Sequence, residues 1–533
     1  MLAAGGGQHK TMEEGEDAYG GTFTQGHGRS RQPGDSHPSG DAYRGDRMRN
    51  SSQTVMSGDA ATPTPTVAPQ PELFGIHAVP PEILVAILGM SADVEDQTPR
   101  TPWDEERRVG GSVLLRLARV CNHWRTIVLE TPSLWACVRV NSRLWDAARS
   151  STGPKRVDYE RLYSRLTQTL HRSANHPLTL HLHADTENSA SAVRLLRFLS
   201  LSSDRWAEAH LSLASNSSCF LSQAQSRLDQ LHTLGIEYAC TDDVNPPFDA
   251  FAVAPRLHTF QFTGVSKYLP QIPWEQIRNF TCRDYDFSYH WLPLLPLAKL
   301  PEGGNCVLDF IVWDARLSSL QVPMECPSGS FSLTLSTLWA DEVVRSEDDN
   351  RRPAKSPMDI FLDAVSFTNL HTLVLCTITV PPSAVFVKTF ERLAQRSDFS
   401  RSLHRLEMSM GATGFTSAEL LSVLLLLPQL QELTAVDPPE ALSGQCLITD
   451  VLLQGLQLLA VCPCLLTLRL TTLGEFAAKT LVALLSARAS EQFRFRVEIV
   501  LLPEHAVLPL ASLYAAADTI EPPVSLVIDA PNM

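Results

Sequence analysis

Two cysteines are the first residues in this sequence that suggest metal chemistry. Cys462 and Cys464 are separated by one proline, which makes them half of a possible zinc site. A complete site needs a second ligand pair, and no other cysteine or histidine pair stands at zinc-finger spacing. We therefore favour a buried thiol at Cys462 over a metal ligand, and we predict no metal site.

The histidines form one cluster, at His176, His181 and His183. His181 and His183 alternate with leucines, so they share one face of an expected strand. We interpret them as an exposed strand face, and a metal site is the alternative. The sequence holds no H-E-x-x-H motif, nucleophile elbow, Walker loop or dinucleotide fingerprint, and Cys462 has no neighbouring histidine as a base. We expect a protein that is not an enzyme and uses no cofactor.

Charge and composition restrict the possible partners. The 533 residues carry a formal net charge of −14, so no broad attraction to nucleic acid or to a membrane surface is expected. The 11 cysteines mostly stand singly, which is typical of reduced thiols in the cytoplasm or nucleus. No signal-peptide core is present near the N-terminus, and the apolar runs are too short to span a bilayer. We expect a soluble cytoplasmic or nuclear protein.

The chain begins with two kinds of segment. Residues 1–70 are rich in Gly, Ser, Asp, Arg, Thr and Pro and almost lack aliphatic residues, which predicts a disordered tail. Residues 71–140 then contain two helical patterns. Pro80-Pro81-Glu82 is a typical helix start, and a second helix is predicted from the apolar spacing between Leu114 and Val128. Between the two helices, residues 91–111 are acidic and contain Pro and Gly, which predicts a solvated linker.

A repeated pattern fills residues 141–533. Segments of the form L-x-x-L-x-L, with apolar substitutes, recur with the spacing of strands in leucine-rich repeats, although less regularly than the roughly 20–29 residues of such repeats. Their first residues are Leu231, Leu257, Leu370, Leu403, Leu430 and Leu465. The long interval after Leu257 predicts hidden degenerate repeats, one near Ile277/Phe280, and a charged loop from Asp341 to Lys355. Apolar helices are predicted over Ala418 to Leu427 and Ala477 to Ala487. The predicted fold is an irregular α/β solenoid.

The two helical patterns resemble a known family. The stretches "VPPEILVAIL" at residues 79–88 and "LLRLARVCNHWRTIVLETPSLW" at residues 114–135 resemble the two halves of the F-box. Val79 stands where the F-box usually has Leu, and the linker is longer than in many F-boxes. The long linker looks like that of a subtype expanded in mushroom-forming (basidiomycete) fungi. Later segments such as "VAPRLHTFQF" at residues 253–262 and "VCPCLLTLRL" at residues 461–470 look like its degenerate leucine-rich repeats, so the resemblance covers most of the chain. This resemblance implies a small helical module that binds a Skp-type adaptor and, through it, a cullin.

The resemblance also implies which residues face or support the adaptor. These are Pro80, Pro81, Ile83, Leu84, Ile87, Leu117, Val120 and Trp124. Some of them must belong to the module's own core, and the sequence does not separate the two roles. The alternative is that the apolar spacing in the second half is only the core stripe of an ordinary helix.

The residues between the repeat leucines suggest where a target could bind. In L-x-x-L-x-L the leucines point inward, so the intervening side chains occupy the opposite face of the sheet. Arg405, Glu407, Glu432 and Arg469 are candidate target contacts, with the arginines as anchors because arginine is favoured at interfaces. An ordinary solvated sheet face is the alternative. We predict a substrate receptor for a ubiquitin ligase with an unknown target protein; the alternative is a repeat-based scaffold that delivers no substrate.

Overall fold

The computed structural model describes residues 79–97, 112–142, 159–184, 189–214, 218–238, 249–264, 269–283, 299–313, 324–326, 331–340, 357–377, 386–410, 415–437, 446–458, 460–489, 495–502, 514–515, 518–520 and 524–529. All of these belong to one compact unit, residues 74–533. The predicted disordered tail over residues 1–70 lies outside the described residues. So does the predicted charged loop from Asp341 to Lys355.

The described chain begins with a small helical module. It comprises α1 (Pro81–Gln97), α3 (Ser112–Leu117), α4 (Asn122–Glu130) and the 3-10 helix η2 (Pro132–Trp135). Pro81 opens α1, where a missing N–H costs no hydrogen bond, and Glu82 complements the positive end of the helix dipole. The module has its own core, made of Leu84, Leu88, Leu114, Ala118, Val128 and Trp135.

Two predictions for this module are wrong. First, α1 continues through Met90 to Gln97, so the helix occupies the start of the predicted linker over residues 91–111. Second, the predicted second helix is divided into α3 and α4. The break lies at Cys121, which is extended (φ −156°, ψ 169°) and caps α4, because its sulfur accepts a hydrogen bond from the Trp124 amide at 3.5 Å. Apolar spacing does not reveal such a cap, since it runs unchanged across the break.

Fourteen of the described strands form one parallel sheet, in which the strands stand in chain order. Two further strands, β8 (Met324–Cys326) and β10 (Val365–Phe367), pair with each other. The sheet strands are β1 (Cys137–Asn141), β2 (Leu178–Ala184), β3 (Trp206–Leu213), β4 (Thr233–Tyr238), β5 (Thr259–Thr263), β6 (Asn279–Arg283), β7 (Asn305–Trp313), β9 (Phe331–Ala340), β11 (Leu370–Thr377), β12 (Arg405–Met410), β13 (Glu432–Val436), β14 (Thr467–Thr472), β15 (Arg496–Leu501) and β16 (Ser525–Asp529). The predicted L-x-x-L-x-L segments all contribute strands to this sheet, and the degenerate repeat predicted near Ile277/Phe280 contributes β6.

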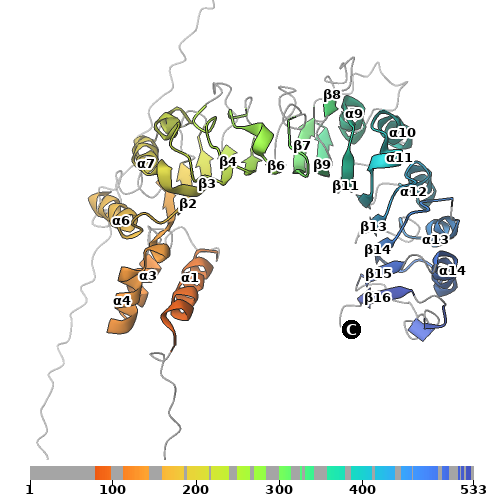
Figure 1. Ribbon diagram of the computed structural model, residues 1–533, viewed down its shortest axis with the longest axis horizontal. Coiled ribbons are helices and arrows are strands. Elements are labelled where there is room, and N and C mark those ends of the chain that lie inside the picture. Colours follow the sequence, from red (N-terminus) through yellow and green to blue (C-terminus); the bar gives the residue numbers. More distant parts are fainter. Residues whose placement is uncertain are drawn as a thin grey trace, which may run out of the picture. The chain divides into compact units, whose positions relative to one another are not determined.

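Helices fill many of the connections between the strands. In Figure 1, α12, α13 and α14 lie on the same side of strands β13 to β15. The helices predicted over Ala418 to Leu427 and Ala477 to Ala487 are confirmed as α12 and α14. The helices of this part are α6 (Tyr159–Arg172), α7 (Ala190–Ser200), η3 (Ser203–Arg205), η4 (Ser218–Ala224), η5 (Trp274–Gln276), α9 (Pro357–Ala364), α10 (Phe386–Arg396), α11 (Phe399–Ser402), α12 (Ser417–Leu424), α13 (Asp450–Gln457) and α14 (Ala478–Arg488).

The repeat leucines form aligned columns beneath the sheet. Leu406, Leu433, Leu468 and Val497 stand at paired positions on four neighbouring strands, and all four are fully buried. Each such side chain contributes roughly 1.5–3 kcal/mol by leaving water. The buried residues of this part form a continuous cluster that extends from Ala136 to Ile520. The opposite face of the sheet therefore carries the side chains that are available to other molecules.

Arginines from later elements bind the free carbonyl groups at the ends of earlier helices. Arg205 donates a hydrogen bond to the Leu170 carbonyl in α6 at 3.4 Å, and Arg396 donates to the Leu362 carbonyl in α9 at 2.7 Å. Arg488 in α14 does the same at the end of α13. The last carbonyls of a helix lack partners within it, so these arginines satisfy them and join neighbouring segments of the fold.

A buried carboxylate joins the end of β13 to two other segments. Asp437 follows β13 and is fully buried. One carboxylate oxygen accepts hydrogen bonds from the amides of Leu447 and Ile448 at 2.7 and 2.9 Å, and the other accepts from the Thr472 hydroxyl at 2.8 Å. Asp437 therefore fixes the end of β13 against the segment before α13 and against β14.

The titration of Asp437 gives a prediction for stability. Burial raises the pKa of Asp437, although its hydrogen-bond donors oppose that rise. A carboxyl whose pKa is raised in the folded state adds stability below the ordinary value of about 4, and that contribution is lost as the pH rises through the raised value. We expect the urea midpoint of the wild type, measured relative to Asp437→Asn, to fall as the pH rises from about 4 through this window. A difference between the two chains that is independent of pH would contradict this prediction.

Candidate functional site

The structure separates the core residues of the helical module from its surface residues. Leu84 is 1% exposed and packs in the module's core. By contrast, Ile83 is 53%, Ile87 43% and Val120 61% exposed. Of the remaining predicted adaptor-binding residues, Pro80 and Pro81 are exposed, while Leu117 and Trp124 are half-buried against the core.

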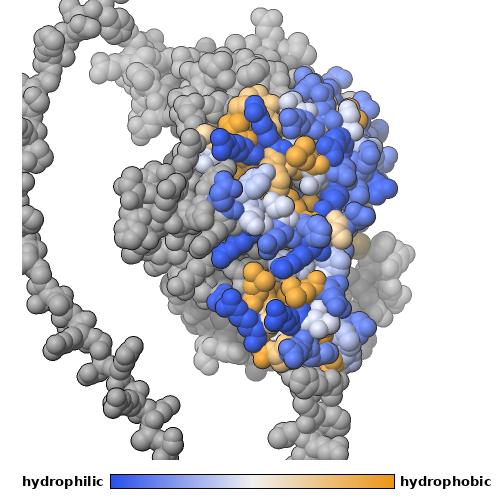
Figure 2. Space-filling view, turned by 90° about the vertical axis from the view of Figure 1, so that its left-hand side faces the viewer, coloured by the Kyte–Doolittle hydropathy of each residue, from blue (hydrophilic) through white to orange (hydrophobic). Residues whose placement is uncertain are grey.

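An apolar stripe follows the exposed side of α1. Ile83, Ile87 and Met90 stand at positions i, i+4 and i+7, which places them on one helix face. Met90 is 60% exposed and is not among the predicted surface residues, because α1 extends further than the sequence predicts. Large exposed apolar patches on a folded protein usually mark a binding surface. On the face of the molecule that Figure 2 shows, apolar patches lie between hydrophilic residues.

Aromatic contacts anchor the second half of the module. The Trp135 indole nitrogen donates a hydrogen bond to the Val128 carbonyl at 2.6 Å, and the Arg172 guanidinium from α6 lies 4.5 Å from the ring centroid. These contacts connect α4, η2 and α6. The indole nitrogen of Trp124 is also buried, and it has no hydrogen-bond partner among the described residues.

The predicted target-binding residues lie together on the polar face of strands β12 to β15. Arg405 lies 3.6 Å from Glu407 and 3.7 Å from Glu432, and Arg469 lies 3.6 Å from Glu432. Arg469 also pairs with Glu498 at 2.8 Å, and this hydrogen bond raises the pKa of Arg469. The four predicted residues therefore belong to one network of ion pairs, which we call the charge ladder. Its further members are Glu498 and Arg496, 2.6 Å apart.

The charge ladder changes the interpretation of its arginines. Arg405 and Arg469 already have carboxylate partners, so a target must replace those partners to bind them. All of these side chains are partly exposed to solvent, and ion pairs at such positions typically contribute only about 0–1 kcal/mol each. Exchange of partners is therefore inexpensive in free energy.

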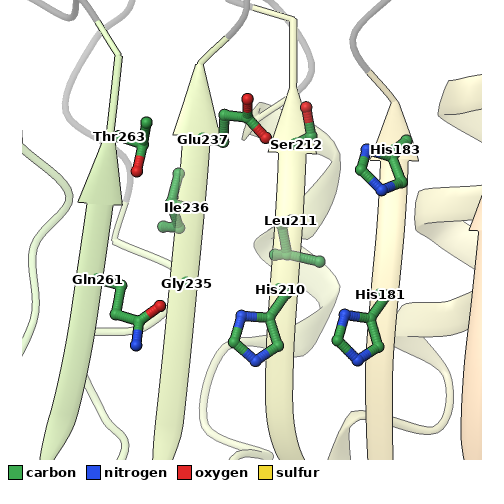
Figure 3. Close-up of a pocket in the computed structure, with 10 residues that line it drawn as sticks. All are labelled: His181, His183, His210, Leu211, Ser212, Gly235, Ile236, Glu237, Gln261 and Thr263. Atoms are coloured by element: carbon green, nitrogen blue, oxygen red, sulfur yellow. The ribbon is translucent and has the colours of Figure 1, made fainter. Parts of the chain in front are cut away.

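A pocket of about 240 Å³ lies on the same polar face, at the other end of the sheet. It is lined by residues of strands β2 to β5, including His181, His210, Gly235 and Glu237 (Figure 3). The prediction that His181 and His183 share the outer face of a strand is confirmed, because Leu180, Leu182 and Ala184, which alternate with them, are buried. Among the described residues, no three His, Cys, Asp or Glu side chains gather as metal ligands would.

Cys462, the first cysteine of the pair, lies in the buried core. Cys462 is 1% exposed, and its thiol donates a hydrogen bond to the Leu424 carbonyl at 3.4 Å. Burial raises the pKa of Cys462 to about 12, so the thiol stays protonated at neutral pH. A protonated, buried thiol is a weak nucleophile. This environment agrees with the interpretation of Cys462 as a buried thiol.

Comparison with known protein families gives a match over the helical module. Residues 76–141 match the family described as F-box-like, and this range includes α1, α3, α4 and η2. The match supports an F-box protein with a role in binding the adaptor of Skp–cullin–F-box ubiquitin ligases. No curated protein matches the chain at a significant level. None of the described helices is long and apolar enough to cross a membrane.

Proposed function

We propose that this protein is the substrate-recognition subunit of a Skp–cullin–F-box ubiquitin ligase. The observation that carries the proposal is the F-box-like domain with Ile83 and Ile87 exposed on α1. The Skp-type adaptor covers this apolar stripe, and a cullin joins the complex through the adaptor. The protein itself performs no catalysis, because its role is to hold a target near the ubiquitin that is transferred.

The remainder of the chain is the target-binding part. We propose that residues 141–533 form an irregular leucine-rich-repeat solenoid, which the chain-order parallel sheet and its aligned leucines support. Such repeats expose one long polar sheet face, and the charge ladder lies on it. The target protein contacts this face. The reduced, singly placed cysteines are in keeping with a site of action in the cytoplasm or nucleus.

Two measurements test this function against the scaffold alternative. The full chain and a chain lacking residues 76–141 are compared for co-purification of adaptor and cullin. Proteins captured by proximity labelling are then followed with and without proteasome inhibition. A substrate receptor brings down adaptor and cullin only when the F-box is present, and its captured proteins become more abundant on inhibition. A scaffold captures the same proteins, and their half-lives do not depend on the F-box.

The charge ladder provides a prediction about target choice. We expect Arg405→Gln with Arg469→Gln to change the set of captured proteins while the chain stays folded, because each exposed pair contributes at most about 1 kcal/mol. Arg405→Lys with Arg469→Lys keeps the charges and serves as the matched control. Capture is measured by proximity labelling, and folding by the urea midpoint. If the glutamine variant captures the same proteins as the wild type, the target does not bind the charge ladder.

A further inference from the structure

A glycine interrupts the row of side chains that crosses strands β2 to β5. The residues His181, His210, Gly235 and Gln261 stand at paired positions on these four strands. The rings of His181 and His210 are stacked, with centroids 4.8 Å apart and planes 10° from parallel. A Cβ atom at Gly235 would lie only 2.6 Å from Nδ1 of His210. The His210 ring therefore occupies space that any other residue at position 235 would fill, and it forms one wall of the pocket.

The size of the pocket suits a single side chain. Its volume of about 240 Å³ is below the roughly 300–1,000 Å³ of sites for drug-sized ligands. Neighbouring strands lie about 4.8 Å apart, so the side chains of His210 and Gln261 stand on strands about 10 Å apart. Figure 3 shows these two side chains on either side of Gly235, with Glu237 further along the same strand. A flat group that enters this space contacts the imidazole ring on one side and the amide on the other.

The chemistry of the walls favours a cation. Burial lowers the pKa of His181 to about 4 and also lowers the pKa of His210, so both rings are neutral at pH 7. Glu237 supplies a carboxylate and Gln261 an amide oxygen, and none of the described residues that line the pocket is a lysine or an arginine. A neutral ring face beside a carboxylate is a setting in which guanidinium groups stack and form hydrogen bonds.

Two arginines on nearby strands could compete with a ligand for the Glu237 carboxylate. Arg139 continues the same row on β1, beside His181, which places it three strands from Gly235, or about 14 Å away along the sheet. Arg283 lies two strands from Glu237 in the adjacent row and pairs with Asp309 at 3.7 Å. Neither arginine lines the pocket, so neither of these two cations occupies the space beside the Glu237 carboxylate.

We propose that the pocket beside Gly235 binds an arginine side chain of the target protein. In this arrangement the guanidinium stacks on the His210 ring and pairs with Glu237, while Gln261 accepts a further hydrogen bond. The net charge of −14 also favours a target with basic residues. The inference rests on the proposed function in so far as the arginine belongs to a target protein. It assigns to strands β2 to β5 a recognition site that is separate from the charge ladder.

The test uses the full chain with its histidines labelled with ¹³C at Cε1 and observed by NMR. N-acetyl-L-arginine amide is titrated in, with N-acetyl-L-citrulline amide as a neutral probe of the same shape and N-acetyl-L-lysine amide as a compact cation. We expect the arginine probe to shift the His210 and His181 signals. The dissociation constant obtained from these shifts is expected to be at least tenfold lower than that of either control probe. Equal binding of the arginine and citrulline probes, or no shift of these signals, would overturn the proposal.

Substitutions locate the site. Glu237→Gln is expected to lower the affinity for the arginine probe at least tenfold. Gly235→Ala is expected to abolish binding of the probe, because the added Cβ displaces the His210 ring. Glu275→Gln removes an exposed carboxylate outside the pocket and is expected to change nothing. If Glu275→Gln and Glu237→Gln lower the affinity for the arginine probe equally, the binding is non-specific and the proposal fails. Urea midpoints of all variants show whether they fold.

The adaptor measurement keeps this test separate from the proposed function. If the chain binds the adaptor but not the arginine probe, the pocket assignment is wrong while the F-box function stands. If the chain binds the arginine probe but no adaptor, the pocket stands and the ligase assignment fails.

Discussion

Replacing Ile83 and Ile87 together by glutamate is expected to weaken adaptor binding more than 100-fold while the chain stays folded. Both side chains are about half exposed on α1, so a charge at either position costs little in the free protein. In a complex the same charges would be buried without partners. Loss of a central apolar contact typically costs 2 kcal/mol or more, and every 1.4 kcal/mol is a tenfold loss in affinity.

This effect is measured by calorimetric titration of the purified chain with a Skp-type adaptor. Leu201→Glu is the matched control, because Leu201 is 59% exposed and lies outside the F-box-like domain. We expect the control to bind the adaptor like the wild type. Wild-type affinity of the Ile83→Glu, Ile87→Glu chain would show that this side of α1 does not face the adaptor.

Removing the guanidinium of Arg488 is expected to lower the free energy of unfolding by about 3–5 kcal/mol. Arg488 is 6% exposed and donates hydrogen bonds to the carbonyls of Leu456 and Cys462 at 2.9 and 2.8 Å. A hydrogen bond to a charged group contributes about 1.5–3 kcal/mol, and its loss leaves buried acceptors without a donor. Arg488→Met keeps most of the side-chain volume, so the change reports mainly the lost hydrogen bonds.

Urea unfolding of the full chain measures this effect. Arg401→Met is the matched control, because Arg401 is 85% exposed at its side chain and pairs only weakly with Asp398 at 3.5 Å. We expect the control to change stability by less than about 0.5 kcal/mol. If Arg488→Met is as stable as Arg401→Met, the hydrogen bonds of Arg488 do not hold α14 against α13.

The strands of the sheet could largely be predicted from the sequence, because buried leucines recur at fixed positions. Leu430, Leu433 and Ala435 predict β13, and all three are buried. Other strands could not be predicted in this way. In β15, valine and isoleucine replace the leucines (Val497 and Ile499), so the strand lacks the signature although its burial alternates in the same way.

The surface of the helical module could be predicted only in part. Ile83 and Leu84 are adjacent and chemically similar, yet one is exposed and the other is in the core. The difference arises from the packing of α1 against α3, α4 and η2, which local sequence does not encode. The correct end of α1 would have added Met90 to the predicted surface, because the i, i+4, i+7 spacing was present.

The candidate sites on the sheet depend on the pairing between strands. Arg469 and Glu498 lie far apart in the sequence and meet because β14 and β15 pair in register. The same is true of His210 and Gly235 on β3 and β4. The L-x-x-L-x-L pattern predicts which face these residues occupy, but the identity of their neighbours follows only from the order of the strands.

The proposed function requires that the F-box-like domain binds a Skp-type adaptor. Light scattering of the purified full chain mixed with purified adaptor measures this binding. We expect a complex of one chain with one adaptor, which does not form when residues 76–141 are deleted. A wild-type chain that stays separate from the adaptor at micromolar concentration, or a deleted chain that still binds it, would contradict the claim.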